Sequence, residues 1–455
     1  MNPRDFLDKN KKKRLDELFD FLRIPSVSAK SEYKKDILAC AEWLSGQLNK
    51  TGIESKIMPT GGHPVVYGEK MVSPDKLTIL YYGHYDVQPP EPLDLWKTTP
   101  FEPLVEDGYI IARGATDDKG QLWTHVKALE AYLATGTDLP VNVKLLIEGE
   151  EEAGSENLEK FIKDNVELLK ADIVVVSDSG QFGKDKPAVT YGLRGLAFVE
   201  VKLTGPDRDL HSGSFGGSIA NPINVLGKII GGLHDENGKI TIDGFYDDVI
   251  PLTDWEKKQF AALPFNKDEY IAKTGSKGLF GDIDYTVLEQ IWGRPTLDVN
   301  GITGGYQGEG AKTIIPSLAT CKITMRLVAD QDPMDICNKI EKYIHKICPD
   351  YVHCEVTKHG GARGVVVPTE GPWLEAAGRA IESGFGIRPV FVKEGGSIPV
   401  VGTFKEVLGL DTLLLGWGQA DDNAHSPNER FSLKDFERGC YSALALIDEI
   451  SKVKV

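Results

Sequence analysis

Residues 77–87 read LTILYYGHYDV, an apolar run that ends in a histidine and an aspartate. Two later segments have the same design: VNVKLLIEGE at 141–150 and ADIVVVSDSG at 171–180. Short apolar runs bounded by polar residues are typical of strands that are buried on both faces, and helical patterns separate them along the chain. This alternation predicts an α/β fold with a mainly parallel central sheet and helices on both faces.

The polar ends of these runs predict a ligand site, because open α/β sheets bind ligands at the carboxyl ends of their strands. Five polar segments place His or carboxylate residues at such element ends: GHYD (83–86), GATDDKG (114–120), EGEEEAGS (148–155), SDSG (177–180) and NAHSPNE (423–429). Any one of them alone has an ordinary explanation, because Asp and Glu are mostly solvated and Asp often caps a helix. Taken together, the five segments indicate one site.

Two histidines and three carboxylates without a cysteine form a ligand set that suits zinc, manganese or cobalt. The number of ligands indicates two ions, with one carboxylate bridging both so that they share and polarise a hydroxide. Asp86, two residues after His84, is expected on the same side of the strand, where it can orient the histidine ring. The doublet Glu151 and Glu152 offers one metal ligand and one group that moves protons.

The pattern of the chain changes near residue 193. An α+β unit is indicated by alternating strands and one helix, which are LAFVEVKLTG (196–205), LATCKITMRLVAD (318–330), PMDICNKIEKYIHKIC (333–348) and YVHCEVTKH (351–359). Strict apolar and polar alternation is typical of half-buried antiparallel strands. After about residue 366 the α/β pattern returns. We therefore predict a catalytic domain in two parts, 1–193 and 366–455, and a second domain inserted between them at 194–365.

Composition and charge exclude several classes of partner. The chain has 455 residues, with 52 basic and 68 acidic side chains and a net charge of −16 at pH 7. This charge repels phosphate backbones and anionic membranes, so we expect neither nucleic acid nor a membrane as a partner. Residues 1–29 lack the continuous apolar segment of a signal peptide and are expected to be helical. The six cysteines form no C-x-x-C pair, which indicates reduced thiols in a cytoplasmic protein.

Motifs of other enzyme classes are broken or absent from the sequence. The segment GGYQGEGAKT (304–313) nearly matches a phosphate-binding loop, but Ala311 separates Gly310 from Lys312. No G-x-S-x-G of a serine hydrolase and no H-E-x-x-H of a zincin occurs. The histidines outside the five polar segments and the DLHSG segment are expected on the surface or in the core; they are His63, His125, His234, His345, His353 and His359.

The chain also resembles a known family. The resemblance is carried by GHYDVQPPEPLDLWKTTPFEP, ARGATDDKGQ, EGEEEAGSENL, YGLRGL, DLHSGSFGG, EGGSIPV and AHSPNE. In this order, from about residue 15 to 450, they are similar to the metallopeptidase family of carnosinase, cytosolic nonspecific dipeptidase, aminoacylase and bacterial carboxypeptidases. TDDKG, DLHSG, GAKTIIP and the AHSPNE ending look most like the carnosinase and nonspecific dipeptidase branch.

The resemblance implies two divalent ions per subunit, zinc or manganese, bridged by Asp117. The implied ligands are His84, Asp117 and Asp178 at one site and Asp117, Glu152 and His425 at the other. Glu151 would be the general base, and Asp86 would support catalysis from behind His84. Asp118, the second acid of TDDKG, is not a ligand in this pattern and would instead fix its loop by hydrogen bonds.

By the same resemblance, the inserted domain would be a lid and dimerisation domain, and the protein a homodimer. His211 would reach from one subunit into the active site of the other and donate a hydrogen bond to the tetrahedral oxyanion. Arg326 would bind the free carboxylate of the substrate with both arms of its guanidinium. Thr313 and Ser397 are similar to polar residues near the substrate terminus.

The main prediction is hydrolysis of the peptide bond of dipeptides by a metal-bridging hydroxide, with Glu151 as the base. One alternative is an N-acyl-amino-acid deacylase with the same metals, and another is a catalytically silent binding protein on this fold. Preference for dipeptides with a free amino terminus over N-acyl substrates would separate the two enzymes. Lack of any turnover would favour the silent protein.

Overall fold

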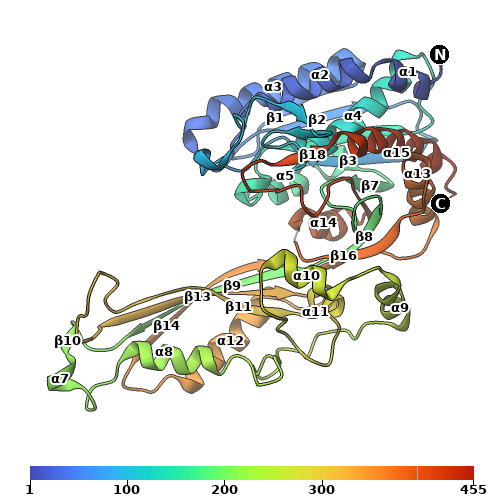
Figure 1. Cartoon of the computed structure of the whole chain (residues 1–455). Helices are drawn as coiled ribbons and strands as arrows, with labels where there is room; N and C mark the ends of the chain where they lie inside the picture. Colours follow the sequence, from blue (N-terminus) through green and yellow to red (C-terminus); the bar gives the residue numbers. More distant parts are fainter. Residues whose placement is uncertain (397, 455) are drawn as a thin grey trace. The chain divides into compact units, whose positions relative to one another are not determined.

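The computed structural model describes residues 1–396 and 398–454. The chain divides into two compact units (Figure 1). Unit 1 contains residues 1–191, 367–392 and 400–455, and unit 2 contains residues 192–366 and 393–399. The catalytic and lid roles of these units stay predictions.

The largest sheet has nine strands, in the order β1-β2-β6-β3-β7-β17-β8-β15, and β16 also pairs with β8. These strands are β1 (Glu54–Met58), β2 (Val65–Lys70), β3 (Thr78–His84), β6 (Asn142–Glu148), β7 (Ile173–Val176), β8 (Ala188–Leu193), β15 (Val365–Val366), β16 (Val390–Glu394) and β17 (Thr412–Gly416). The four central strands β6, β3, β7 and β17 run parallel, whereas β1, β2, β8 and β15 pair antiparallel. The predicted α/β fold with a parallel central sheet is confirmed.

Helices and short helical turns surround this sheet (Figure 1). They are α1 (Pro3–Lys9), α2 (Lys11–Leu22), η1 (Ser31–Tyr33), α3 (Lys34–Thr51), η2 (Leu93–Leu95), α4 (Lys119–Ala134), η3 (Glu151–Ala153), α5 (Leu158–Asp164), α6 (Val166–Leu169), α13 (Pro372–Phe385), α14 (Pro399–Thr403), η4 (Phe404–Leu408) and α15 (Leu433–Ser451). The helix expected within residues 1–29 forms as two, α1 and α2, which are separated at Asn10.

Alternate side chains of the central strands reach opposite faces of the sheet. Ile79 and Tyr81 of β3 pack into the large apolar cluster that contains α2, α3, α4, α13 and α15. Tyr82, the next residue of β3, points to the opposite face and contacts Phe404 of η4, with 5.7 Å between ring centroids. On β6, the ammonium group of Lys144 donates to backbone carbonyls at the end of α6. Both faces are therefore covered, as the sequence predicts.

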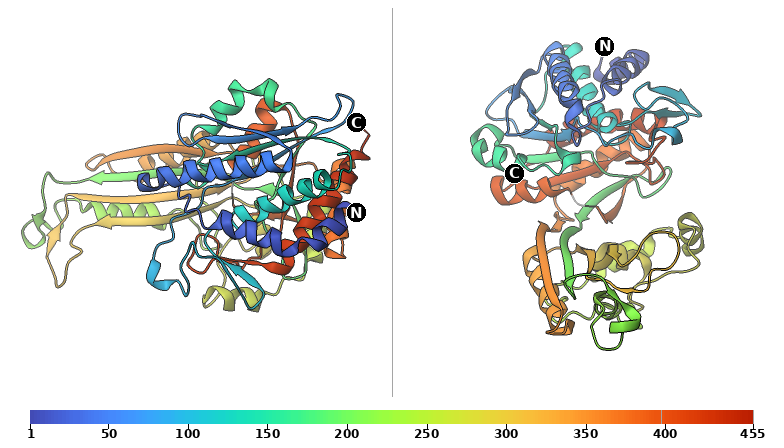
Figure 2. Two further views of the ribbon diagram at one scale, coloured as in Figure 1. Left: turned by 90° about the horizontal axis from the view of Figure 1, so that it is seen from above. Right: turned by 90° about the vertical axis from the view of Figure 1, so that its left-hand side faces the viewer.

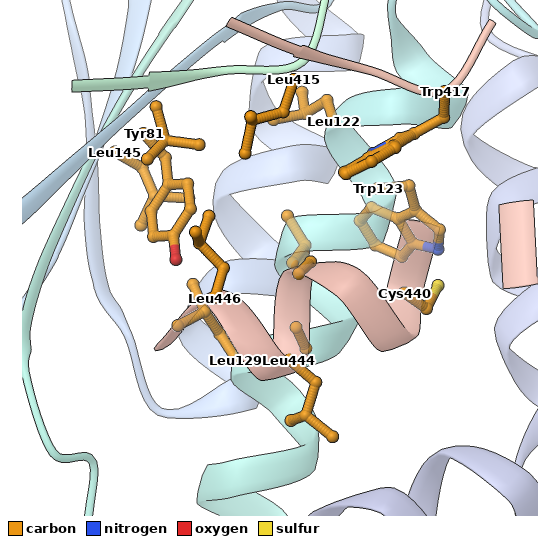
Figure 3. Packing of buried hydrophobic residues seen from close by; sticks show 14 of the residues in the cluster. Tyr81, Leu122, Trp123, Leu129, Leu145, Leu415, Trp417, Cys440, Leu444 and Leu446 are labelled. Atoms are coloured by element: carbon orange, nitrogen blue, oxygen red, sulfur yellow. The ribbon is translucent and has the colours of Figure 1, made fainter. Parts of the chain in front are cut away.

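The core of unit 1 is dense where α4 and α15 meet the sheet. Figure 3 shows Trp123 and Leu129 of α4 packed near Cys440 and Leu446 of α15, with Tyr81 of β3 close by. Every residue of α4 from 119 to 129 is buried, including its polar side chains. A helix that is buried on all sides is held rigidly, so the loop before α4 has a fixed base.

Each unit also contains one smaller sheet among the described residues. A three-stranded sheet in unit 1 contains β4 (Leu104–Glu106), β5 (Tyr109–Ile111) and β18 (Arg430–Ser432). In unit 2, β10 (Leu210–His211) pairs antiparallel with β12 (Ile314–Ile315).

Unit 2 is built on a four-stranded antiparallel sheet with the order β11-β13-β9-β14. Its strands are β11 (Thr296–Gly304), β13 (Leu318–Leu327), β9 (Gly195–Thr204) and β14 (His353–Ala362). Its helices are α7 (Ser212–Phe215), α8 (Pro222–Gly231), α9 (Asp254–Ala262), α10 (Lys267–Thr274), α11 (Val287–Gly293) and α12 (Pro333–Ile347). The long helices α8 and α12 lie against one face of the sheet (Figure 2). On β13, Cys321, Ile323 and Met325 are buried toward this face, which matches the alternation in the sequence.

Among the described residues, no helix combines the length and apolar character that crossing a membrane requires.

Candidate metal centre

The parallel register brings several polar segments to one edge of the sheet. His84 is the last residue of β3 and pairs with Glu148, the last residue of β6. Glu151 and Glu152 follow β6 in the turn η3, and Asp178 follows β7 by two residues. Because neighbouring parallel strands end at the same edge, these side chains meet there.

Two groups of side chains offer ligand atoms that all lie within 4.8 Å of one another. They are His84, Asp117 and Asp178, and Asp117, Glu152 and His425. Asp117 belongs to both groups and uses a different oxygen toward each histidine. Its Oδ1 lies 3.1 Å from His84 Nε2, and its Oδ2 lies 2.8 Å from His425 Nε2. Within residues 1–396 and 398–454 no other such group of three occurs.

The donor chemistry fits two divalent ions. Imidazole nitrogen and carboxylate oxygen are ligands of zinc and manganese, and a carboxylate that faces two histidines can bridge two ions. His84 is fully buried, and its Nδ1 lies 3.0 Å from the backbone carbonyl of Asp86. A neutral ring that donates from Nδ1 to this carbonyl leaves Nε2 free as a metal ligand, which is the usual arrangement behind a ligating histidine.

The carboxylate of Asp86 contacts the turn η3 as well as lying near His84. It lies 3.5 Å from His84 Nδ1, farther than the backbone carbonyl of the same residue. Its two oxygens accept hydrogen bonds from the backbone N–H of Glu151, at 3.2 Å, and of Glu152, at 3.0 Å. Asp86 therefore joins the end of β3 to the turn that carries both glutamates.

The site concentrates carboxylates whose side chains are mostly buried. Burial raises the pKa of Glu151 to about 7, and burial together with the charge of Asp117 raises the pKa of Glu152 to about 9. Against its own burial, Asp117 has a lowered pKa because His425 and His84 hydrogen-bond to it. The bond to Asp117 in turn raises the pKa of His425 to about 9. Two dications would compensate this cluster and invert its local pKa shifts.

Asp118, which follows the shared ligand, has a structural position. The peptide bond between Asp117 and Asp118 is cis. Asp118 Oδ2 accepts a 3.3 Å hydrogen bond from the backbone N–H of His84. Asp118 also stands at the N-terminus of α4 and is buried, and this burial raises its pKa well above the ordinary value. These contacts agree with the loop-fixing role that the resemblance implies.

Three polar residues at the site were not assigned a role from the sequence. Gln88 donates from Nε2 to Glu152 Oε2 at 2.7 Å, and Glu148 accepts from the hydroxyl of Tyr82 at 2.6 Å. Glu429 accepts four hydrogen bonds around the loop that precedes α4. All three lie in or next to the polar segments. The sequence could have indicated them by this position beside motif residues, but their spacing forms no motif.

The other predicted site residues lie in unit 2 or outside the described residues. His211 on β10 and Thr313 are neighbours, because the backbone N–H of Ser212 donates to the carbonyl of Thr313 at 3.1 Å. Arg326 lies on β13, on the partly exposed face opposite the buried side chains. Ser397 lies outside the described residues. The structure thus gathers the five proposed ligands, Asp86 and Glu151 in unit 1, and gathers His211 with Thr313 in unit 2.

His211 has a defined ring orientation. Its Nδ1 accepts a 3.0 Å hydrogen bond from the backbone N–H of Gly213. In the neutral ring an accepting Nδ1 leaves the proton on Nε2, so Nε2 is a hydrogen-bond donor.

The chain is similar to known peptidases over most of its length. Residues 80–449 match the model of Peptidase family M20/M25/M40. The Cys-Gly metallodipeptidase DUG1 of Saccharomyces cerevisiae is 34% identical over 98% of this chain and 97% of its own length. The Beta-Ala-His dipeptidase of Homo sapiens is 33% identical over 86% of this chain and 78% of its own length. The solved structure of an M20 family metallo-carboxypeptidase, Sso-CP2 from Sulfolobus solfataricus, is 35% identical with a TM-score of 0.87, and the match covers 97% of this chain and 99% of that one.

Proposed function

The chain belongs to peptidase family M20/M25/M40, and from that premise we propose that it hydrolyses the peptide bond of dipeptides at a two-metal centre. The observation that supports the proposal most strongly is the position of Asp117, whose two oxygens face two different histidines. The proposed ligands are His84, Asp117 and Asp178 for one ion and Asp117, Glu152 and His425 for the other. When bound, two zinc or manganese ions would polarise the scissile carbonyl and generate the attacking hydroxide near neutral pH.

Glu151 is the proposed general base. Its backbone N–H is held by Asp86, and its carboxylate belongs to neither ligand group, although it lies in the electrostatic field of Asp117 and Asp178. Glu151 would take the proton of the attacking water and return it to the leaving amine. Its neighbour Glu152 serves as ligand, so one turn supplies both functions.

Unit 2 supplies the proposed substrate contacts. His211 presents Nε2–H as a donor, which suits a negatively charged oxygen of the tetrahedral state. Arg326 would bind the free carboxylate of the substrate, and Thr313, beside His211, would contact the same end of the substrate. We further propose a homodimer in which His211 serves the active site of the partner subunit. A cytoplasmic setting agrees with the six cysteines, all of which are free.

The test is a substrate panel with enzyme that has been chelated and reconstituted separately with zinc and with manganese. The panel contains Cys-Gly, β-Ala-His, other free dipeptides, N-blocked dipeptides and N-acyl amino acids. We expect metal-dependent cleavage of the free dipeptides. Cleavage of N-acyl substrates alone would assign a deacylase instead, and no turnover with either metal would favour a silent binding protein.

The role of Glu151 is tested with two matched variants. Glu151→Gln removes the base and is expected to lower kcat by about 10²–10⁴-fold with two metals still bound. Glu150→Gln makes the same change one residue away, where the carboxylate accepts from the backbone N–H of His63 and from Asn157. This control is expected to keep activity. A Glu151→Gln enzyme with more than a tenth of wild-type kcat would reject Glu151 as the base.

A further inference from the structure

The buried carboxylate of Glu429 lies four residues after His425, in the same loop. Glu429 is fully buried, and it forms an ion pair of 2.7 Å with Arg113, which is also buried. Its Oε1 accepts from the backbone N–H groups of Thr116, at 2.9 Å, and Asp117, at 3.1 Å. Its Oε2 accepts from the N–H of Gly114, at 2.9 Å, and from Arg113 Nη1. Four donors therefore converge on one side chain.

These bonds connect the two segments that carry Asp117 and His425. The N–H of Asp117 is bound directly, so the backbone of this ligand is fixed relative to the loop that carries the other. A second contact reinforces the connection, because Asp422 Oδ2 accepts from the hydroxyl of Thr116 at 3.1 Å. Asn428 holds the far side of the loop. Its side chain accepts a hydrogen bond from the N–H of Lys97 and donates one to the backbone carbonyl of Leu95.

Stability alone does not explain a buried pair of charges. A buried ion pair loses about as much in desolvation as it gains in attraction, and apolar side chains of the same size often serve a core as well or better. Apolar side chains cannot accept backbone hydrogen bonds, however. The three backbone N–H groups that Glu429 binds all belong to the loop 114–117, which ends at Asp117. The pair of Glu429 and Arg113 therefore serves to hold that loop.

We propose that Glu429 is a positioning residue that holds the shared ligand Asp117 in register with His425, and thereby sets the affinity of the metal centre. The inference rests on the proposed function in one respect, because Asp117 and His425 are taken as ligands. Arg113 is the companion of Glu429: it balances the buried charge, and its guanidinium also lies 5.5 Å from the ring centre of Trp96.

The experiment measures metal binding rather than turnover. Glu429→Gln keeps the size of the side chain but presents an amide NH₂ to N–H donors. Affinity and stoichiometry for Co²⁺ are measured by titration calorimetry and by the visible Co²⁺ spectrum. We expect binding about 10–100-fold weaker than in the wild type and a changed spectrum, as is usual when a residue that supports a metal ligand is lost. Amide hydrogen exchange at residues 114–117 is expected to rise.

Two further variants separate positioning from folding. Glu429→Gln leaves Arg113 as an unpaired buried charge, so the combined variant Arg113→Met with Glu429→Gln removes both charges and is expected to regain thermal stability without regaining Co²⁺ affinity. Glu130→Gln is the matched control: its carboxylate pairs with Lys127 at 2.7 Å in the same unit, away from the metal ligands. It is expected to bind Co²⁺ like the wild type.

The outcomes distinguish this inference from the proposed function. A folded double variant with wild-type Co²⁺ affinity and spectrum would overturn the role of Glu429, even if the wild type hydrolyses dipeptides. A wild type that binds two ions but hydrolyses no peptide would overturn the proposed function and leave the role of Glu429 standing, provided that the variants lose affinity.

Discussion

In the proposed metal centre, the single carboxylate of Asp117 would decide whether two ions can be held. With one oxygen toward His84 and the other toward His425, it lies between two ligand sets that otherwise share no member. Only 18% of its side chain is exposed, so its charge is poorly screened by water and attracts cations strongly. Neighbouring side chains hold this arrangement from behind: Asp86 supports the glutamate turn, and Glu429 supports Asp117 itself.

At the residue scale, the buried ring of His125 leads to a prediction about the pH dependence of stability. Its ring is buried beside Tyr81, its Nε2 lies 2.6 Å from the hydroxyl of Ser177, and burial lowers its pKa to about 3. The unfolded chain has the ordinary histidine pKa of ~6.5, so between these values the unfolded state binds more protons and stability is lost as pH falls. From pH 7 to pH 5 this one group is expected to cost about 2 kcal/mol.

Urea unfolding of the wild type and of His125→Gln at both pH values checks this expectation. The variant cannot titrate in this range, so its free energy of unfolding should fall by about 2 kcal/mol less than that of the wild type. Equal pH dependence in the two proteins would show that His125 is not a buried neutral ring.

At the scale of elements, strand β17 needs a glycine at its end. Gln181 donates its N–H to the carbonyl of Gly418 at 2.7 Å, so the segment after Asp178 crosses close to β17. A Cβ atom on Gly416 would lie 2.2 Å from the backbone carbon of Ser179, and backbone cannot move away cheaply. This close approach fixes the course of the chain just beyond a proposed metal ligand.

Gly416→Ala is therefore expected to lower the free energy of unfolding by about 1–3 kcal/mol, because the core is overpacked there. It should also weaken metal binding, since the segment that moves is continuous with Asp178. Gly46→Ala in α3 is the control, because a Cβ there meets nothing within 4 Å. That change should stabilise the protein by about 0.5–1 kcal/mol. Urea unfolding and Co²⁺ titration measure both effects, and a Gly416→Ala protein of wild-type stability would contradict the close approach.

At the scale of the whole molecule, the proposed homodimer makes the active site depend on two chains. A heterodimer of Glu151→Gln and His211→Ala subunits, purified with two different tags, contains one site with both residues intact if His211 acts on the partner's site. Such a heterodimer is expected to show about half of wild-type activity per dimer, although each parent homodimer is inactive. If His211 acts within its own chain, both sites are damaged and the heterodimer is inactive as well.

Removal of metal tests whether the folded molecule is stabilised by bound ions. The clustered carboxylates of the centre repel one another without cations, and an ion that binds only the folded state stabilises it by about 2.7 kcal/mol at a concentration of 100 Kd. Chelation is therefore expected to lower the Tm of the wild type in calorimetry. Asp117→Asn, which weakens both ligand groups, should show little further loss on chelation. A wild-type Tm that does not respond to chelator would argue against resident ions.

The predictable part of this protein lies in its local patterns. Apolar runs that end in His or carboxylate residues, as in 77–87, predicted the central strands and the edge at which they meet. Apolar and polar alternation, as in 318–330, predicted the antiparallel sheet of unit 2. The break between α1 and α2 at Asn10 was not predicted, because the residues on both sides are compatible with a continuous helix.

The sequence by itself determined the central strands, the alternating strands of unit 2 and the chemical types of the proposed ligands, because burial periodicity and clustered donors are properties of short segments. Only the tertiary structure decided how these segments hold one another. Asp86 binds a backbone N–H 65 residues away, and Glu429 binds that of Asp117 across 312 residues. Such contacts leave no periodic trace in the chain, because they depend on which strand ends and loops come together after the core has packed.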